Sequence, residues 1–170
     1  MLIRLATHQD IKSILSIVRS AQLSLKELGI DQWQDGYPSE SVITDDITHG
    51  VGYVICSDDG AVVGYEAIVL TGEEAYRQIA DEVWNTPQRY VVVHRLCVSG
   101  SCRRCGVAQE LMAYAAKYAV ANGINAFRID THKGNVRMLS LLRKLGFKYV
   151  GVVRYDSGER EAFDMNLNNN

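Results

Sequence analysis

An apolar run followed by a short basic turn and a helical pattern constrains the fold of this chain more than any other feature. The run spans residues 90–98 and contains four valines, which is typical of a strand. The turn contains Arg103, Arg104 and Gly106, and a helical pattern starts near Val107. The first N–H groups of a helix have no partner within it and carry partial positive charge, so this turn suits a phosphorylated ligand. The arginines add charge, and Gly106 allows close backbone approach.

Two common phosphate loops are absent, because the sequence contains neither G-x-x-x-x-G-K-[ST] nor G-x-G-x-x-G. The pattern that fits is [QR]-x-x-G-x-[GA], formed here by Arg103, Gly106 and Ala108. This pattern resembles the acetyl-coenzyme A (acetyl-CoA) loop of the GNAT superfamily of N-acetyltransferases.

Helical and strand patterns alternate along the whole chain. We expect strands at residues 2–6, 51–57, 61–70, 90–98, 126–131, 147–155 and 159–167, and helices at residues 11–28, 39–47, 105–122 and 135–145. Thr7 and Asp10 have the spacing of a capping box before the first helix. The order β-α-α-β-β-β-α-β-α-β-β predicts the α/β class (an α+β mixed sheet) with helices on both faces. Residues 1–167 are expected to form one domain and residues 168–170 a frayed tail.

A second segment strengthens the resemblance. Asn135 precedes a helical pattern that closes with Leu145-Gly146-Phe147, as in the second cofactor segment of GNAT proteins. Together with the element order, this identifies the chain as a GNAT superfamily N-acetyltransferase of small bacterial type, and the resemblance implies the GNAT acyl-CoA N-acyltransferase fold. Residues 32–38 and 129–132 resemble the same branch, whose acceptors are mostly unassigned.

The resemblance implies acetyl-CoA as cosubstrate, with no metal. The residues expected to contact it are Leu96, Cys97, Val98, Arg103, Arg104, Cys105, Gly106, Val107, Ala108, Asn135 and Arg143. Residues 103–108 would hold the pyrophosphate, residues 96–98 would pair with the pantetheine arm, Asn135 would bind the arm, and Arg143 would touch its far end. One position departs from the family pattern: Leu142 stands where many members carry the tyrosine that protonates the leaving thiolate.

His94 is the candidate general base, because an unperturbed imidazole titrates near neutrality and some family members carry a histidine there. The alternative is a hydrogen-bonded core histidine without a catalytic role. Strand alternation places His94 on the face of Val92, Leu96 and Val98.

The acceptor site is expected to involve Trp33, Tyr37 and Glu66. The two aromatic side chains lie in the segment that usually roofs the acceptor in this fold, although they could instead seal the edge of the core. Glu66 could bind an amine or be a solvated strand carboxylate. Asp130 could be paired with Arg95 or Arg128 as structural charge.

These features predict an enzyme that acetylates a primary amine, on a small molecule or a peptide, by direct attack in a ternary complex. The alternative is a sensor or subunit that binds acyl-CoA without turnover, which the residue at position 142 favours.

The net charge of −2 argues against nucleic acid, and no apolar run is long enough to span a membrane, so a cytoplasmic protein is expected. Family members are often dimers, which makes a homodimer the expected assembly. Four cysteines are read as free thiols, since one C-x-x-C pair is too few ligands for structural zinc.

Overall fold

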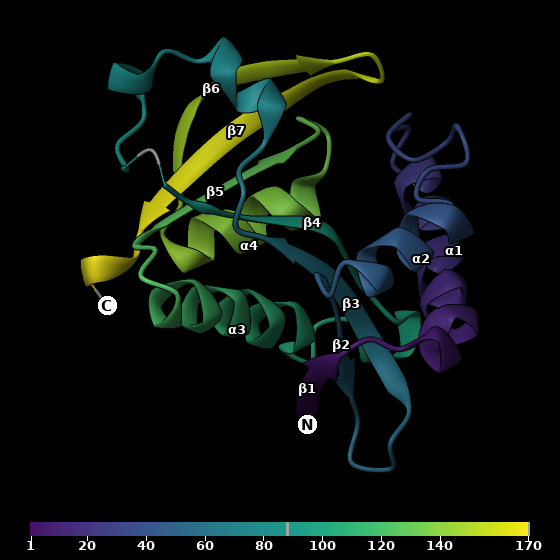
Figure 1. The fold of residues 1–170 in the computed structure, drawn as a ribbon. Helices are drawn as coiled ribbons and strands as arrows, with labels where there is room; N and C mark the ends of the chain where they lie inside the picture. The colour runs from purple at the N-terminus through teal and green to yellow at the C-terminus, as the bar shows by residue number, and fades with distance from the viewer. Residues whose placement is uncertain (88, 170) are drawn as a thin grey trace. The chain divides into compact units, whose positions relative to one another are not determined.

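The computed structural model describes residues 1–87 and 89–169, apart from the side chain of residue 169. Within this part of the chain, strands and helices follow the predicted order, and every boundary lies within two residues of its predicted place (Figure 1). The strands are β1 (Leu2–Leu5), β2 (Gly52–Cys56), β3 (Val62–Val69), β4 (Val91–Val98), β5 (Ala126–Thr131), β6 (Lys148–Tyr155) and β7 (Gly158–Asn166). The helices are α1 (Ile11–Glu27), α2 (Glu40–Thr48), α3 (Val107–Ala121) and α4 (Val136–Leu145). The predicted α/β class with a mixed sheet is confirmed.

The described chain forms two compact units. Unit 1 consists of Met1–Ile68 and Val93–Tyr114, and unit 2 consists of Val69–Val92 and Ala115–Asn170. The sheet order is β1-β2-β3-β4-β5-β7-β6, in which β4 contributes residues to both units.

Unit 1 is built on the antiparallel strands β1, β2 and β3. The apolar stripe of α1 buries Ile14, Ile17 and Val18 in a core cluster that also includes Val54 of β2. The predicted capping contact at the start of this region is present, since Asp10 accepts a hydrogen bond from the Thr7 N–H at 2.8 Å. Asp10 also pairs with Arg4 of β1 at 2.8 Å, so the same carboxylate joins the first strand to the chain entering α1.

The backbone of β4 is irregular at Arg95, which has a φ of 57°. A left-handed residue in a strand turns the chain locally, as in a β-bulge. After this point alternation is regular: Leu96 and Val98 pack on the cluster that contains Val107 and Leu111 of α3, whereas Cys97 lies in the cluster with Ile14. Leu96 and Val98 therefore share one face as predicted, while the placement of His94 on that face stays a prediction.

Unit 2 contains the parallel pair β4–β5 and the antiparallel strands β5, β7 and β6. Its core cluster includes Tyr76, Trp84, Val92 and Val153. Arg128 of β5 is buried between two aromatic rings, with its guanidinium carbon 4.1 Å from the centroids of both Trp84 and Tyr90. The expected pairing of Asp130 with Arg95 or Arg128 is wrong, because Asp130 accepts hydrogen bonds from the hydroxyls of Tyr76 and Tyr155 at 2.9 and 2.8 Å.

Two of the three residues of the predicted frayed tail lie among the described residues. Residues 168 and 169 belong to a short 3-10 helix, Leu167–Asn169, and Asn170 lies outside the described residues. None of the helices in residues 1–87 and 89–169 is long and apolar enough to cross a membrane.

Candidate functional site

The predicted phosphate loop connects β4 to α3 within unit 1. Its start is anchored by the Ser99 N–H, which donates to the Val63 carbonyl at 2.8 Å, and a 3-10 helix, Gly100–Cys102, follows. Arg104 and Gly106 both have positive φ, 64° and 84°. These turns bring the chain into α3, whose first-turn N–H groups have no partner within the helix.

Gly106 is required by its backbone conformation and leaves space beside it. Its φ of +84° is one that side-chain-bearing residues rarely adopt. A Cβ atom placed there would meet no atom within 4 Å. The loop therefore presents open backbone at the helix start, which is the local geometry that an anionic group can occupy.

The two arginines of the loop differ in their contacts. Nη2 of Arg103 lies 3.4 Å from both the carbonyl and the hydroxyl of Ser20 in α1. The side chain of Arg104 is exposed, as is that of Cys105. Both side chains are thus at the surface of unit 1 on the loop that precedes α3, where they can add charge for a phosphate.

Cys97 is a core residue rather than a reactive thiol. It is 5% exposed, and burial raises the pKa of its thiol to about 12. Cys105, by contrast, is exposed. Among the described residues, no three histidine, cysteine, aspartate or glutamate side chains are grouped so that they could hold a metal ion.

His94 lies directly before the irregular residue of β4 and is partly buried. Burial, with a smaller contribution from the Arg95 guanidinium, lowers the pKa of His94 from 6.5 to about 4. The imidazole is therefore neutral at pH 7 and able to accept a proton, but it is a weaker base than an unperturbed histidine. The role predicted for His94 stays a prediction.

Glu66 occupies a fully buried position in the middle of β3, opposite Tyr53 of β2. Both carboxyl oxygens lack a hydrogen-bond partner among the described residues. Burial raises the pKa of this carboxyl from 4.5 to about 8, so it is largely protonated at pH 7. A neutral carboxyl attracts an ammonium group less than a carboxylate does, and the predicted contact with an acceptor amine stays a prediction.

Trp33 and Tyr37 lie together in the irregular segment between α1 and α2. Their rings meet edge to face with centroids 6.4 Å apart. Trp33 packs partly against the core cluster beneath α1, whereas Tyr37 is 36% exposed. The Tyr37 hydroxyl accepts a hydrogen bond from Arg95 at 2.8 Å, which connects this segment to β4. Trp33 thus lies at the edge of the core and Tyr37 at the surface, and their predicted contact with an acceptor stays a prediction.

The two remaining cofactor candidates, Asn135 and Arg143, belong to unit 2. Asn135 is the N-cap of α4, since its side-chain oxygen accepts a hydrogen bond from the Met138 N–H at 3.2 Å. Arg143 is exposed on the same helix. Leu142 is fully buried, so the position that carries tyrosine in many relatives contributes to the core here.

Sequence reasoning missed two residues that the structure places near Arg95. Asp46 of α2 pairs with Arg95 at 2.6 Å, and Tyr65 of β3 donates to the same carboxylate at 2.7 Å. A charged residue within the apolar run of residues 90–98 was the signal for a buried ionic partner. The choice of Asp46 required the tertiary structure, because this aspartate lies 49 residues away along the chain.

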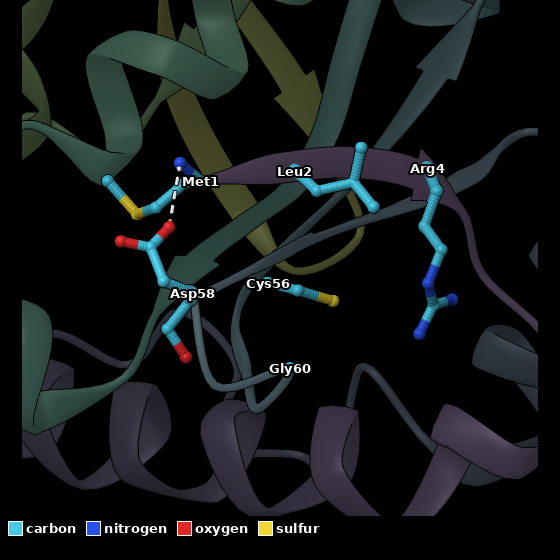
Figure 2. A pocket seen from close by; sticks show the side chains of 7 residues that line it. Met1, Leu2, Arg4, Cys56, Asp58 and Gly60 are labelled. Atoms are coloured by element: carbon cyan, nitrogen blue, oxygen red, sulfur yellow. Dashed lines mark ion pairs between the residues drawn. The ribbon is translucent and has the colours of Figure 1, made fainter.

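A surface hollow of about 470 Å³ lies elsewhere in unit 1, at β1 and the β2–β3 hairpin (Figure 2). It is lined by Met1, Leu2, Arg4, Cys56, Ser57, Asp58 and Gly60. The terminal amine of Met1 pairs with Asp58 at 3.3 Å across it. No residue predicted to bind acetyl-CoA or an acceptor lines this hollow.

Comparison with known proteins places these features in a class of acyltransferases. The sequence model of the Acetyltransferase (GNAT) family matches residues 18–147. This chain therefore belongs to the GNAT acetyltransferase family, as the sequence motifs predicted. The match covers β2 to β5, the loop before α3 and all of α4.

Solved structures agree with this assignment. A GNAT-family acetyltransferase from Streptococcus agalactiae is 35% identical, with a TM-score of 0.87 over 97% of this chain and 94% of that one. A phosphinothricin acetyltransferase from Sinorhizobium meliloti, solved in complex with acetyl-CoA, shares the fold at 18% identity, with a TM-score of 0.71 over 98% and 88% of the two chains.

A curated relative matches a shorter region. The chloroplastic GCN5-related N-acetyltransferase 6 of Arabidopsis thaliana is 31% identical over 75 residues, which are 44% of this chain. The match spans only 26% of that protein's length. It supports the family and does not extend that protein's activity to this chain.

Proposed function

We propose that this protein transfers an acetyl group from acetyl-CoA to a primary amine, on a small molecule or a peptide, by direct attack within a ternary complex. The observation that carries the proposal is the turn from β4 into α3 in a chain of this family. There, open backbone at Gly106 and the exposed guanidinium of Arg104 border the first N–H groups of a helix. The acetyl-CoA in the Sinorhizobium meliloti structure, a protein of the same fold, supports this choice of donor.

The residues of this chain have distinct roles in the proposal. Residues 103–108 bind the pyrophosphate, mainly through backbone N–H groups, and the backbone of residues 96–98 pairs with the pantetheine amides. Asn135 and Arg143 bind other parts of the cofactor. Acetyl-CoA supplies an activated acyl group, and the N–H groups of residues 96–98 are the candidate donors to the oxyanion that develops on attack.

His94 of unit 1 is the proposed acceptor of the proton that the attacking amine loses. The neutral imidazole of His94 takes the proton that the amine loses as it attacks, and its low pKa returns that proton readily to solvent. Trp33 and Tyr37 border the acceptor, whereas Glu66 is fully buried in β3 and contacts the acceptor only after a local opening of the structure. The leaving thiolate receives its proton from water, since Leu142 provides no acid.

Calorimetric titration with acetyl-CoA, and with coenzyme A alongside, tests the donor site. We expect micromolar or tighter binding for the wild type and its loss in Gly106→Asp, because the new carboxylate lies beside the pyrophosphate. Gly123→Asp is the matched control: Gly123 follows the other end of α3, also has positive φ, and has no atom near its Cβ position. Wild-type affinity in Gly106→Asp would refute the placement of the loop.

The buried Leu142 favours a second candidate, an acyl-CoA sensor or subunit without turnover. The loss of one acid does not abolish transfer in itself, since a coenzyme A thiolate is a fair leaving group. A panel of primary amines, assayed by release of free thiol, separates the two. Cofactor binding without turnover on any amine, together with a change in oligomeric state, would support the sensor.

A further inference from the structure

Four side chains of unit 1 form a continuous hydrogen-bonded network, which we call the Arg95 network. Arg95 of β4 donates to Oδ1 of Asp46 on α2 at 2.6 Å and to the hydroxyl of Tyr37 at 2.8 Å. The Tyr65 hydroxyl of β3 donates to the second oxygen of Asp46 at 2.7 Å. The network thus joins β3, β4, α2 and the segment between α1 and α2.

The network runs from the interior toward the surface. Tyr65 is fully buried, the side chains of Asp46 and Arg95 are 8% and 12% exposed, and Tyr37 is 36% exposed. Burial raises the pKa of the Tyr65 hydroxyl, and the Asp46 carboxylate raises it further, so Tyr65 remains a donor. Because both charges are nearly out of solvent, each is held in place by the other.

The central residue of the network also has the irregular backbone. Arg95 has a φ of 57°, a conformation that costs free energy for any residue with a Cβ. Such a conformation persists only where surrounding contacts over-determine it. Asp46 and Tyr37 supply those contacts from two different elements.

The neighbours of Arg95 connect the network to the reaction. His94, which precedes Arg95, is the proposed base, and Leu96, which follows it, begins the backbone proposed to pair with the cofactor. A rotation of the chain at Arg95 would redirect both at once. Tyr37, at the outer end, belongs to the segment proposed to border the acceptor.

We propose that Arg95 is a positioning residue for acetyl transfer, a role that rests on the proposed function. Its bonds to Asp46 and Tyr37 hold β4 in the conformation that orients His94 and the Leu96 backbone, and they tie the acceptor segment to that conformation. Acceptor contacts at Tyr37 are thereby linked to the geometry of the reacting groups, although Arg95 itself touches neither substrate.

The least invasive test is Tyr37→Phe, which removes one hydroxyl from a partly exposed ring. We expect kcat/KM for the amine to fall about tenfold, since small misplacements of reacting groups have effects of this order. Acetyl-CoA affinity should fall less than kcat/KM does, because the loop at residues 103–108 is not altered, and Tm should change little. Tyr149→Phe is the matched control, because Tyr149 is an exposed tyrosine of unit 2.

Two further variants distinguish a positioning role of Arg95 from a role in stabilising the fold. Arg95→Lys keeps the charge beside Asp46 but cannot form both bonds with the same fork geometry, so it should fold and lose kcat as Tyr37→Phe does. The double variant Arg95→Lys/Tyr37→Phe should be no slower than Arg95→Lys alone, because both changes remove the same bond.

The outcomes are distinct. An active wild type whose kcat and KM are unchanged by Tyr37→Phe would overturn the role of Arg95 and leave the proposed function standing. If the losses in kcat are additive in the double variant, or if they parallel the losses in Tm, the network supports the fold and does not position the reacting groups. A wild type that neither binds acetyl-CoA nor acetylates any amine would overturn the proposed function, and the role of Arg95 with it.

Discussion

Replacing Glu66 by glutamine should remove a pH dependence from the stability of this protein. Both oxygens of the buried Glu66 carboxyl lack a hydrogen-bond partner among the described residues. Its pKa is raised from 4.5 to about 8 by burial. Between these two values the folded protein keeps a proton on Glu66 that the unfolded chain releases. The free energy of unfolding therefore falls as pH rises from 4.5 and levels off above about 8.

The magnitude follows from the size of the pKa shift. Each pH unit inside this window lowers the free energy of unfolding by about 1.4 kcal/mol, so the wild type should lose about 3 kcal/mol between about pH 5 and pH 7.5 through this group alone. Glutamine has nearly the same shape and does not titrate. Glu66→Gln should thus match the wild type near pH 5 and exceed it by about 3 kcal/mol near pH 7.5.

Urea unfolding followed by tryptophan fluorescence at several pH values measures this difference. Subtracting the free energy of unfolding of the wild type from that of the variant at each pH cancels the contributions of all other titrating groups. Glu82→Gln, at an exposed glutamate, is the control and should give a flat difference. A difference that is also flat for Glu66→Gln would refute the reasoning, because it would mean that the Glu66 carboxyl is ionised and solvated in the folded protein.

Three other predictions address the site and its support. His94→Ala should lower kcat by about a hundredfold with little change in acetyl-CoA affinity, and the wild-type rate should show no inflection near pH 6.5, because the pKa of His94 is about 4; both are read from steady-state kinetics. Asp10→Asn should lower stability by about 1–2 kcal/mol at neutral pH. Because the bond from Arg4 lowers the pKa of Asp10 to about 2, the loss should disappear as pH falls through that value, which acid unfolding curves would show. Thiol labelling should modify Cys105 rapidly and Cys97 only on unfolding, and equal rates in peptide mapping would contradict the burial of Cys97.

The order and bounds of the elements could be predicted from sequence because their signals are local. The apolar stripe of α1 and the glycine after α4 each act within a few residues. The phosphate loop was predictable for the same reason, since a strand, a turn with Gly106 and a helix follow one another directly.

What could not be predicted depends on residues far apart in the chain. Asp130 was expected beside an arginine, but two tyrosine hydroxyls satisfy its carboxylate. The left-handed conformation of Arg95 has no local signal, because arginine does not favour positive φ. It depends on Asp46 and Tyr37, whose positions are set by tertiary packing. Likewise, the low pKa of His94 and the high pKa of Glu66 arise from burial, which residue type does not reveal.

The division of β4 and α3 between the two units limits which fragments of this protein contain a whole unit. Neither unit is a continuous stretch, since the chain enters unit 2 at Val69, returns to unit 1 at Val93 and leaves it again after Tyr114. A fragment ending before Val93 lacks the strand segment and helix start that complete unit 1. Truncation, fusion at an internal site or recombination with a relative therefore has to keep both stretches of each unit together.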